Sequence, residues 1–147
     1  MLYPKKYLLP ATLISLQDLA LAPFGKVKTM PVVAENQFAI LAGADCYEGY
    51  YSTIPQHIHW DNAVPARIVA TIGLYRPTKI VHKITCPVLL TGATLDSLIP
   101  ISATRKMSKK NALIQYHEYN CGHFDLFHEP FKSNILAQQK QFLISLK

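Results

Sequence analysis

An aspartate and a histidine, two residues that often share proton-transfer chemistry, each follow a segment in the second half of the chain that has the pattern of a β-strand. Asp96 comes just after residues 84–93, and His123 lies in the loop that follows residues 112–119. A carboxylate that accepts one imidazole proton leaves the other ring nitrogen free to act as a base, and it stabilises the imidazolium that then forms. The pair could therefore activate a nucleophile if folding brings the two side chains together.

These two segments are predicted to be parallel strands of one sheet. Residues 88–90 are a continuous apolar run, which is typical of a strand buried on both faces. A helix predicted over residues 102–110, with Ser102 as its cap, joins the strands, and its length suits a parallel crossover. Chemistry in open parallel sheets gathers at the carboxyl ends of the strands, so we expect Asp96 and His123 to be neighbours.

The rest of the chain reads mainly as helices. Apolar spacing predicts helices over residues 11–22 and 62–75, and Asp45 is a plausible cap for a helix over residues 46–52. Residues 27–33 alternate loosely and are predicted to be extended. A final helix begins at Pro130 and is expected to pack on the sheet through one stripe. That stripe consists of Phe131, Ile135, Gln138, Phe142 and Leu146.

Length and composition indicate one ordinary folded domain. The chain has 147 residues, of which 50% are hydrophobic and 16% charged, so it does not have the composition of a disordered chain. We expect a single domain over residues 1–147, with a helix-rich segment at 1–77 and two strands with their loops at 78–147. Gln17 and Asp18 interrupt the longest apolar run, so no membrane span is predicted.

Charge and cysteine content narrow the function classes further. The net charge of +6 comes from scattered lysines and arginines without interleaved aromatic residues, so nucleic-acid binding is not expected. The three cysteines are widely spaced and fit neither a disulfide framework nor a metal motif. These features favour a reducing, cytoplasmic location.

Two motifs resemble the α/β-hydrolase superfamily. Residues 84–100, with a Cys-Pro-Val-Leu start followed by a glycine, Asp96 and a proline, are similar to the strand and loop that carry the catalytic acid. Residues 120–124, Asn-Cys-Gly-His-Phe, are similar to the loop that carries the catalytic histidine, and the order of acid and histidine also agrees. The resemblance is good over residues 84–147. Residues 32–50 and 62–67 more distantly resemble the middle of dienelactone-hydrolase and dipeptidyl-peptidase-like enzymes.

This resemblance implies a partial α/β-hydrolase fold, with a short parallel sheet flanked by helices. The chain would be the C-terminal portion of a serine hydrolase, with Asp96 and His123 catalytic and no cofactor. The implied activity is cleavage of a carboxylic ester, or of an amide or thioester, in a small-molecule or peptide-like substrate.

One departure from the family governs the expected activity. The G-x-S-x-G pentapeptide that carries the nucleophile occurs nowhere in the 147 residues. The early strands and the loop that completes the oxyanion hole are also expected to be missing, so the isolated chain is expected to be an inactive, truncated hydrolase. The alternative is a non-catalytic interaction module, or a half-enzyme that pairs with a separate N-terminal half or with itself.

Other residues offer competing interpretations of the site. Asp125 could replace Asp96 as the acid, Ser97 or Ser102 could serve as a substitute nucleophile, and Cys121 could support thiol chemistry. The sequence favours a turn-capping role for Asp125, loop and cap hydroxyls for the serines, and a small buried side chain for Cys121.

Histidines and aromatic residues leave two further possibilities. His57 and His59 could bind a metal with other histidines, but no recognised ligand spacing completes such a site, so no metal is expected. A group of aromatic residues could line an acyl or leaving-group pocket, although core packing is the simpler role. This group is Tyr47, Tyr50, Tyr51 and Trp60, and the remaining histidines are His82, His117 and His128.

Overall fold

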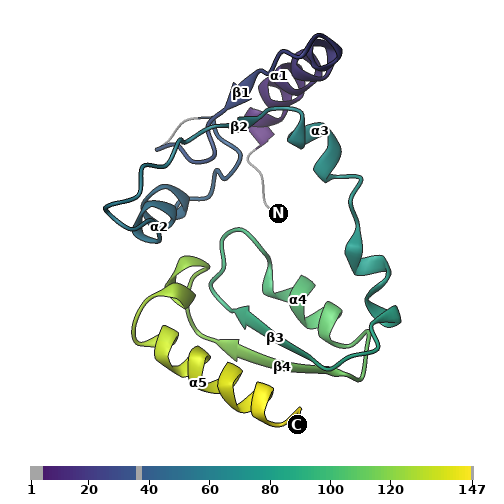
Figure 1. Ribbon diagram of the computed structural model, residues 1–147, viewed down its shortest axis with the longest axis vertical. Coiled ribbons are helices and arrows are strands. Elements are labelled where there is room, and N and C mark those ends of the chain that lie inside the picture. The colour runs from purple at the N-terminus through teal and green to yellow at the C-terminus, as the bar shows by residue number, and fades with distance from the viewer. Residues whose placement is uncertain (1–4, 36–37, 147) are drawn as a thin grey trace. The chain divides into compact units, whose positions relative to one another are not determined.

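The computed structural model describes residues 5–35 and 38–146, which fall into two units (Figure 1). One unit ends at Arg76 and the other begins at Pro77. The internal division expected from the sequence lies one residue later, between residues 77 and 78. Each unit has its own secondary structure and is described separately.

The C-terminal unit contains the predicted parallel strand pair. β3 (Val88–Ala93) pairs with β4 (Ile114–Tyr119) in register from Val88 opposite Ile114 to Ala93 opposite Tyr119. The helix between them, α4 (Ile101–Ser108), completes the crossover, and α5 (Phe131–Ile144) follows β4 (Figure 1). Short 3-10 turns lie at η3 (Pro77–Lys79), η4 (Val81–Lys83) and η5 (Phe124–Phe127).

The two helices pack on opposite faces of this sheet. On one face, Gly92 and Tyr116 lie against Ile101 of α4. On the other, the Tyr119 ring meets the Phe131 ring of α5 edge-on, with centroids 6.3 Å apart. Residues 116 and 119 differ by an odd number of positions, so their side chains point to opposite faces of the strand. The predicted three-layer arrangement of helix, sheet and helix is therefore present.

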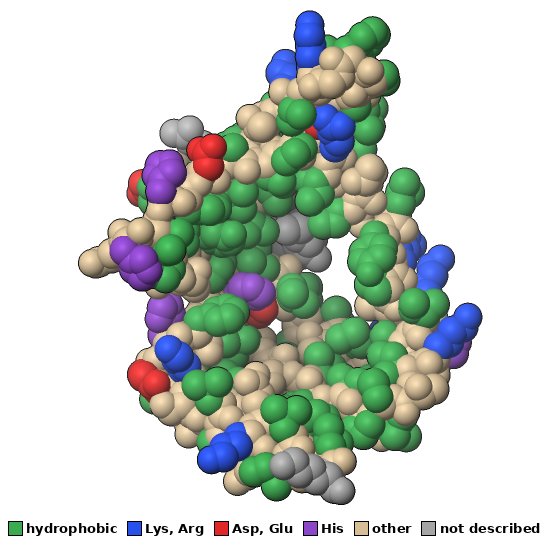
Figure 2. Space-filling model, in the orientation of Figure 1, with side chains coloured by type: hydrophobic (Ala, Val, Ile, Leu, Met, Phe, Trp, Pro, Cys, Tyr) green, Lys and Arg blue, Asp and Glu red, His purple; other side chains and the backbone are tan. Residues whose placement is uncertain are grey.

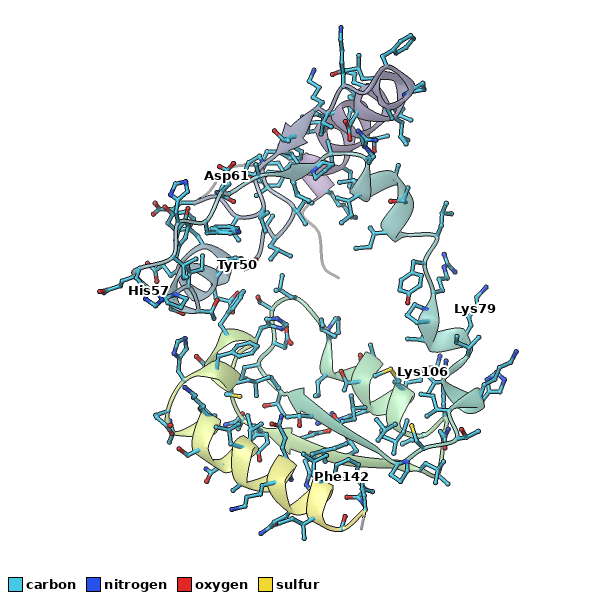
Figure 3. All side chains as sticks on the ribbon, viewed as in Figure 1. Tyr50, His57, Asp61, Lys79, Lys106 and Phe142 are labelled. Carbon is cyan, nitrogen blue, oxygen red and sulfur yellow. The ribbon has the colours of Figure 1, made fainter. Side chains whose placement is uncertain are left out.

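The predicted stripe of α5 holds this helix on the sheet. Ile135 is buried, and the Tyr119 hydroxyl donates a hydrogen bond to Gln138 over 3.4 Å. Phe142 is half-buried on the same helix (Figure 3). Leu146, the last position of the stripe, lies beyond the end of α5 and is exposed.

An ion pair joins α4 to β4. The Arg105 guanidinium donates two hydrogen bonds of 2.7 Å to the Glu118 carboxylate, and it lowers the pKa of Glu118 to about 2. Burial raises the pKa of Tyr116, two residues earlier on the same strand, to about 12. The prediction that Ser102 caps α4 is wrong: the helix begins at Ile101, directly after Pro100, so Ser102 lies in its first turn.

The N-terminal unit is less regular than the sequence suggested. Its largest element is α1 (Leu8–Leu21), which begins earlier than predicted because Pro10 falls in the first turn, where it costs no hydrogen bond. The remaining elements are η1 (Lys5–Tyr7), η2 (Ala22–Phe24), β1 (Thr29–Met30), α2 (Cys46–Ser52), β2 (Val64–Pro65) and α3 (Ile68–Ile72). The helix predicted at 46–52, directly after Asp45, is confirmed as α2.

The helix predicted over residues 62–75 is wrong for most of its length. β2 pairs antiparallel with β1, with Thr29 opposite Pro65 and Met30 opposite Val64, so its residues are extended. The Asn62 side chain accepts hydrogen bonds from the backbone N–H groups of Val32 and Val33, at 2.9 and 3.1 Å. These long-range bonds compete with a local helix, which survives only as α3.

Helix α1 buries two polar side chains and exposes most of its leucines. Ala11, Ser15 and Asp18, spaced by four and three residues, are fully or almost fully buried. Five leucines of α1 are exposed, Leu9 to 70%, and hydrophobic side chains reach the surface over this helix (Figure 2). They are Leu8, Leu9, Leu13, Leu16 and Leu19.

An ion pair between buried Asp18 and half-buried Arg67 fixes this orientation. Asp18, whose side chain is 0% exposed, accepts hydrogen bonds from Arg67 Nε at 2.7 Å and from the Lys28 backbone N–H at 2.6 Å. The Arg67 guanidinium holds the pKa of Asp18 well below its usual range. Ser15 Oγ accepts the Ala70 N–H over 3.1 Å. Turning the leucines inward would leave the Asp18 charge without these partners.

One helical stretch of the described residues, Lys5–Phe24, is long and apolar enough to cross a membrane by length and composition alone. Gln17 and Asp18, on which the expectation of no membrane span rests, both lie within this stretch. The criteria of length and composition do not test insertion, so the expectation of no membrane span stays a prediction. In this structure, the same stretch places Asp18 against Arg67 within the protein.

The contact between β3 and α4 predicts a strong requirement for glycine at position 92. A Cβ on Gly92 would lie 2.7 Å from Tyr116 Oη and 2.8 Å from Ile101 Cδ1, closer than real Cβ contacts. We expect Gly92→Ala to lower the free energy of unfolding by about 1–3 kcal/mol in chemical denaturation. Gly73→Ala is the matched control, because a Cβ there meets nothing within 4 Å. Equal stability of the two variants would contradict this packing.

Candidate active site

The structure brings Asp96 and His123 into direct contact. His123 Nδ1 lies 2.8 Å from Asp96 Oδ2, although the residues are 27 positions apart. The Asp96 side chain is only 8% exposed, whereas that of His123 is 29% exposed. The acid is therefore enclosed, and the imidazole reaches the surface of the unit.

Two backbone groups fix the second oxygen of Asp96. Oδ1 accepts hydrogen bonds of 2.8 Å from the N–H groups of Leu98 and Ile99. This arrangement closes the loop after β3 around the carboxylate and directs Oδ2 to the imidazole. The sequence-predicted loop thus uses one carboxylate oxygen for its own conformation and the other for His123.

The contact with Asp96 decides which imidazole nitrogen carries a proton. An ionised carboxylate can only accept, so Nδ1 must donate its N–H to Asp96 Oδ2. Neutral His123 then has a lone pair on Nε2, and no described residue forms a hydrogen bond with that nitrogen. This is the state that a general base requires.

Asp125 has a different role from Asp96. Its Oδ2 accepts the Gly122 N–H over 2.7 Å and closes the turn that contains His123. The His123 ring also meets the Phe124 ring edge-on, with centroids 5.0 Å apart. The sequence favours a capping role for Asp125, and this hydrogen bond has that form.

The loops that carry the acid and the histidine are bonded to each other. The parallel ladder continues past the strands, because the Thr94 N–H donates to Tyr119 O and the Leu95 N–H donates to Cys121 O, at 2.9 and 3.0 Å. Thr94 Oγ1 also donates to Asn120 Oδ1 over 2.8 Å. Sequence reasoning missed Thr94 and Asn120. Since each follows the last residue of its strand, a register that matched the predicted strand ends could have paired them.

The structure gives little support to a nucleophile within this chain. Cys121 is 2% exposed, and burial, followed by the nearby carboxylates of Asp125 and Asp96, raises the pKa of its thiol. A thiol of this kind is a poor nucleophile at neutral pH. Ser102 lies in the first turn of α4. Ser97 lies in the loop between β3 and α4, and the loop-hydroxyl role that the sequence favours for it stays a prediction.

The histidines outside the site do not gather into a metal centre. No group of three or more His, Cys, Asp or Glu side chains that could hold a metal occurs among the described residues. His57, which Figure 3 labels, and His59 lie in the loop after α2, in the N-terminal unit. His117 is on β4 and His128 follows η5, both in the C-terminal unit, while His82 lies in η4.

The aromatic group of the N-terminal unit packs against itself. Trp60 lies 4.8 Å from the Tyr50 ring and 5.6 Å from the Tyr51 ring, and Tyr47 lies 4.9 Å from Tyr51, measured between centroids. Tyr51 and Trp60 also border an open groove of about 350 Å³. Mutual packing of these rings is therefore observed, and the alternative of a pocket for an acyl or leaving group is untested.

Comparisons with known proteins support the fold. No protein-family model matches the chain, and no curated protein matches it. Among solved structures, the chain is similar to DcsB in complex with its substrate analogue, with a TM-score of 0.75 and 15% identity over 97% of this chain and 52% of that one. It is also similar to the α/β hydrolase GrgF from Penicillium sp. sh18, with a TM-score of 0.68 and 17% identity over 94% of this chain and 49% of that one.

The chain has a partial α/β-hydrolase fold. It spans about half the length of the two solved structures that it matches. Sequence identities of 15% and 17% support a shared fold and nothing more specific. Membership of the dienelactone-hydrolase and dipeptidyl-peptidase-like branch therefore stays a prediction. Within an α/β-hydrolase fold, Asp96 and His123 lie on the loops after two adjacent parallel strands, as the sequence predicted.

The environment of Cys121 predicts selective thiol chemistry. All three cysteines are free thiols, but only Cys86 is exposed. We expect iodoacetamide near pH 8 to alkylate Cys86 at least about ten-fold faster than Cys121 in the native chain, because burial keeps the Cys121 thiol protonated and out of reach. Mass spectrometry of tryptic peptides measures both rates, and an unfolded sample is the control in which they converge. Fast native labelling of Cys121 would contradict the burial of this thiol.

Proposed function

We propose that this chain supplies the general base and its orienting acid to a serine hydrolase that cleaves carboxylic esters, or related amides and thioesters, in small-molecule or peptide-like substrates. The observation that carries the proposal is the 2.8 Å contact between His123 Nδ1 and Asp96 Oδ2, with the other carboxylate oxygen fixed by two backbone N–H groups. The α/β-hydrolase fold supports it, because that fold hosts serine hydrolases.

The proposed mechanism follows from the free nitrogen of the imidazole. His123 Nε2 takes the proton of a serine hydroxyl as that oxygen attacks the carbonyl carbon of the substrate. Asp96 keeps its negative charge and stabilises the imidazolium. The same proton then passes to the leaving group, and a second cycle with water releases the acyl group and restores the serine.

The nucleophile and the oxyanion-hole donors must come from polypeptide outside these 147 residues. Catalytic triad members act as a unit, so a base and an acid alone retain little of the rate enhancement. The chain is therefore proposed to be half of an active site. Free thiols at all three cysteines suit the cytoplasmic location that the sequence favours.

Activity measurements test this proposal. We expect the isolated chain to show no p-nitrophenyl butyrate turnover above buffer and no labelling by a fluorophosphonate. When the chain is co-expressed with a polypeptide that completes the fold and carries the serine elbow, we expect turnover to appear. His123→Ala should then reduce kcat by at least about 1,000-fold.

The control for this experiment is His128→Ala, which removes a histidine five positions further along the chain. It should leave turnover within about two-fold of the unsubstituted complex. Turnover by the isolated chain, with fluorophosphonate on Ser97 or Ser102, would show that the chain carries its own nucleophile and would contradict the half-site.

A second candidate function, a non-catalytic interaction module or half-enzyme, is favoured by surfaces that ordinarily need a partner. The leucines of α1 face outward while Asp18 and Arg67 hold its other side. Within the described residues β3 pairs only with β4, so its other edge has no strand beside it. Apolar faces and free strand edges of this kind favour association.

The leucine face predicts self-association of the isolated chain. We expect light scattering after size exclusion to show species larger than a monomer, and Leu13→Glu combined with Leu16→Glu to reduce their fraction by at least about five-fold, because charge on an apolar interface opposes burial. Gln139→Glu, which adds one charge at an exposed site on α5, is the control. A clean wild-type monomer with a sharp, cooperative melt would count against this function.

A further inference from the structure

We propose that Thr94 and Asn120 are positioning residues that lock the acid loop to the histidine loop and set the contact between Asp96 and His123. The inference rests on the proposed role of Asp96 as the acid and of His123 as the base. Neither Thr94 nor Asn120 is proposed to touch the substrate. We call the 2.8 Å hydrogen bond between the Thr94 and Asn120 side chains the latch.

The latch sits where the regular ladder ends. β3 ends at Ala93 and β4 at Tyr119, so Thr94 and Asn120 are the first residues beyond the two strands. The Thr94 backbone N–H still bonds to the end of β4, while its hydroxyl turns to the Asn120 side chain. Thr94 is thus bonded to the end of β4 through its backbone N–H and to the following residue, Asn120, through its hydroxyl.

The latch is close to the reacting pair along both loops. Asp96 is two residues after Thr94, and His123 is three residues after Asn120. Only a few backbone torsions therefore separate the latch from the contact between Nδ1 and Oδ2. Displacements of about 1 Å at a catalytic group can cost two orders of magnitude in rate, so a restraint at this distance bears on catalysis.

Other hydrogen bonds hold the conformation of each loop but do not connect the two loops. Asp96 Oδ1 shapes the acid loop through Leu98 and Ile99, and Asp125 closes the histidine turn through Gly122. These bonds act within one loop. The Leu95 N–H to Cys121 O bond and the latch, in contrast, join one loop to the other beyond the strand ends, as the catalytic contact does.

Four substitutions test the latch, two that remove its hydrogen bond and two that keep it. Thr94→Val keeps the branched shape and removes the hydroxyl, whereas Thr94→Ser keeps the hydroxyl. Asn120→Ala removes the acceptor from the other loop. Thr91→Val makes the same change three residues earlier on β3 and is the control, because it leaves the latch intact.

The test is the solvent exchange rate of the His123 Nδ1 proton, measured by NMR on the 147-residue chain. No hydrolysis is needed. We expect the proton to exchange about five-fold faster in Thr94→Val, as for the loss of one modest hydrogen bond, and to a similar extent in Asn120→Ala. Thr94→Ser and Thr91→Val should match the wild type.

Asp96→Asn separates failure of this inference from failure of the proposed function. Its amide can donate to Nδ1 and should abolish the Nδ1 proton signal. If Asp96→Asn abolishes the signal while Thr94→Val and Asn120→Ala both exchange like wild type, the latch is overturned and the proposed acid–base pair stands. Equal acceleration in Thr94→Val and Thr91→Val also overturns the latch, since it indicates general loosening of β3. An unchanged signal in Asp96→Asn refutes the pair itself.

Discussion

The parallel pairing of β3 with β4 is the constraint on which the candidate site depends. Register places Ala93 opposite Tyr119, so the loops that carry Asp96 and His123 leave the same edge of the sheet. From there the acid lies three residues on and the histidine four, and their side chains meet at 2.8 Å. Features that hold the strands and α4 together, such as the close contact at Gly92 and the pair of Arg105 with Glu118, therefore also hold the site.

A second constraint, the ion pair of buried Asp18 with Arg67, organises the N-terminal unit. A charge removed from water must be compensated by hydrogen bonds, and Asp18 obtains them from Arg67 and from the Lys28 N–H. The cost of losing these partners fixes the rotation of α1 and leaves its leucines exposed. The unit thus keeps an apolar patch in contact with solvent, which is the physical basis for expecting association.

The elements that could be predicted best from the sequence are those whose signals are local. The apolar run of residues 88–90 and the length of the crossover indicated β3, α4, β4 and their parallel direction, and Asp45 marked the start of α2. From these strands alone, the proximity of Asp96 and His123 could be predicted, and the structure places them in contact. Their catalytic role stays a prediction.

The failures have non-local causes. Asn62 bonds to Val32 and Val33, about thirty residues earlier, and no helical periodicity reveals such a competitor. Asp18 looked like an interruption of an apolar run because its partner, Arg67, lies 49 residues away. Thr94 and Asn120 differ from these, since the register of the two predicted strands is enough to pair them.

We propose that Asp96 determines which nitrogen of the neutral His123 imidazole carries the proton. The most direct test is a measurement of the tautomer of that ring. Long-range ¹H–¹⁵N NMR above the titration range of the histidine distinguishes a proton on Nδ1 from one on Nε2. We predict an Nδ1–H tautomer in the wild type and an Nε2–H tautomer in Asp96→Asn. A wild-type ring protonated on Nε2 would contradict the claim, because that nitrogen could then not accept a proton from any nucleophile.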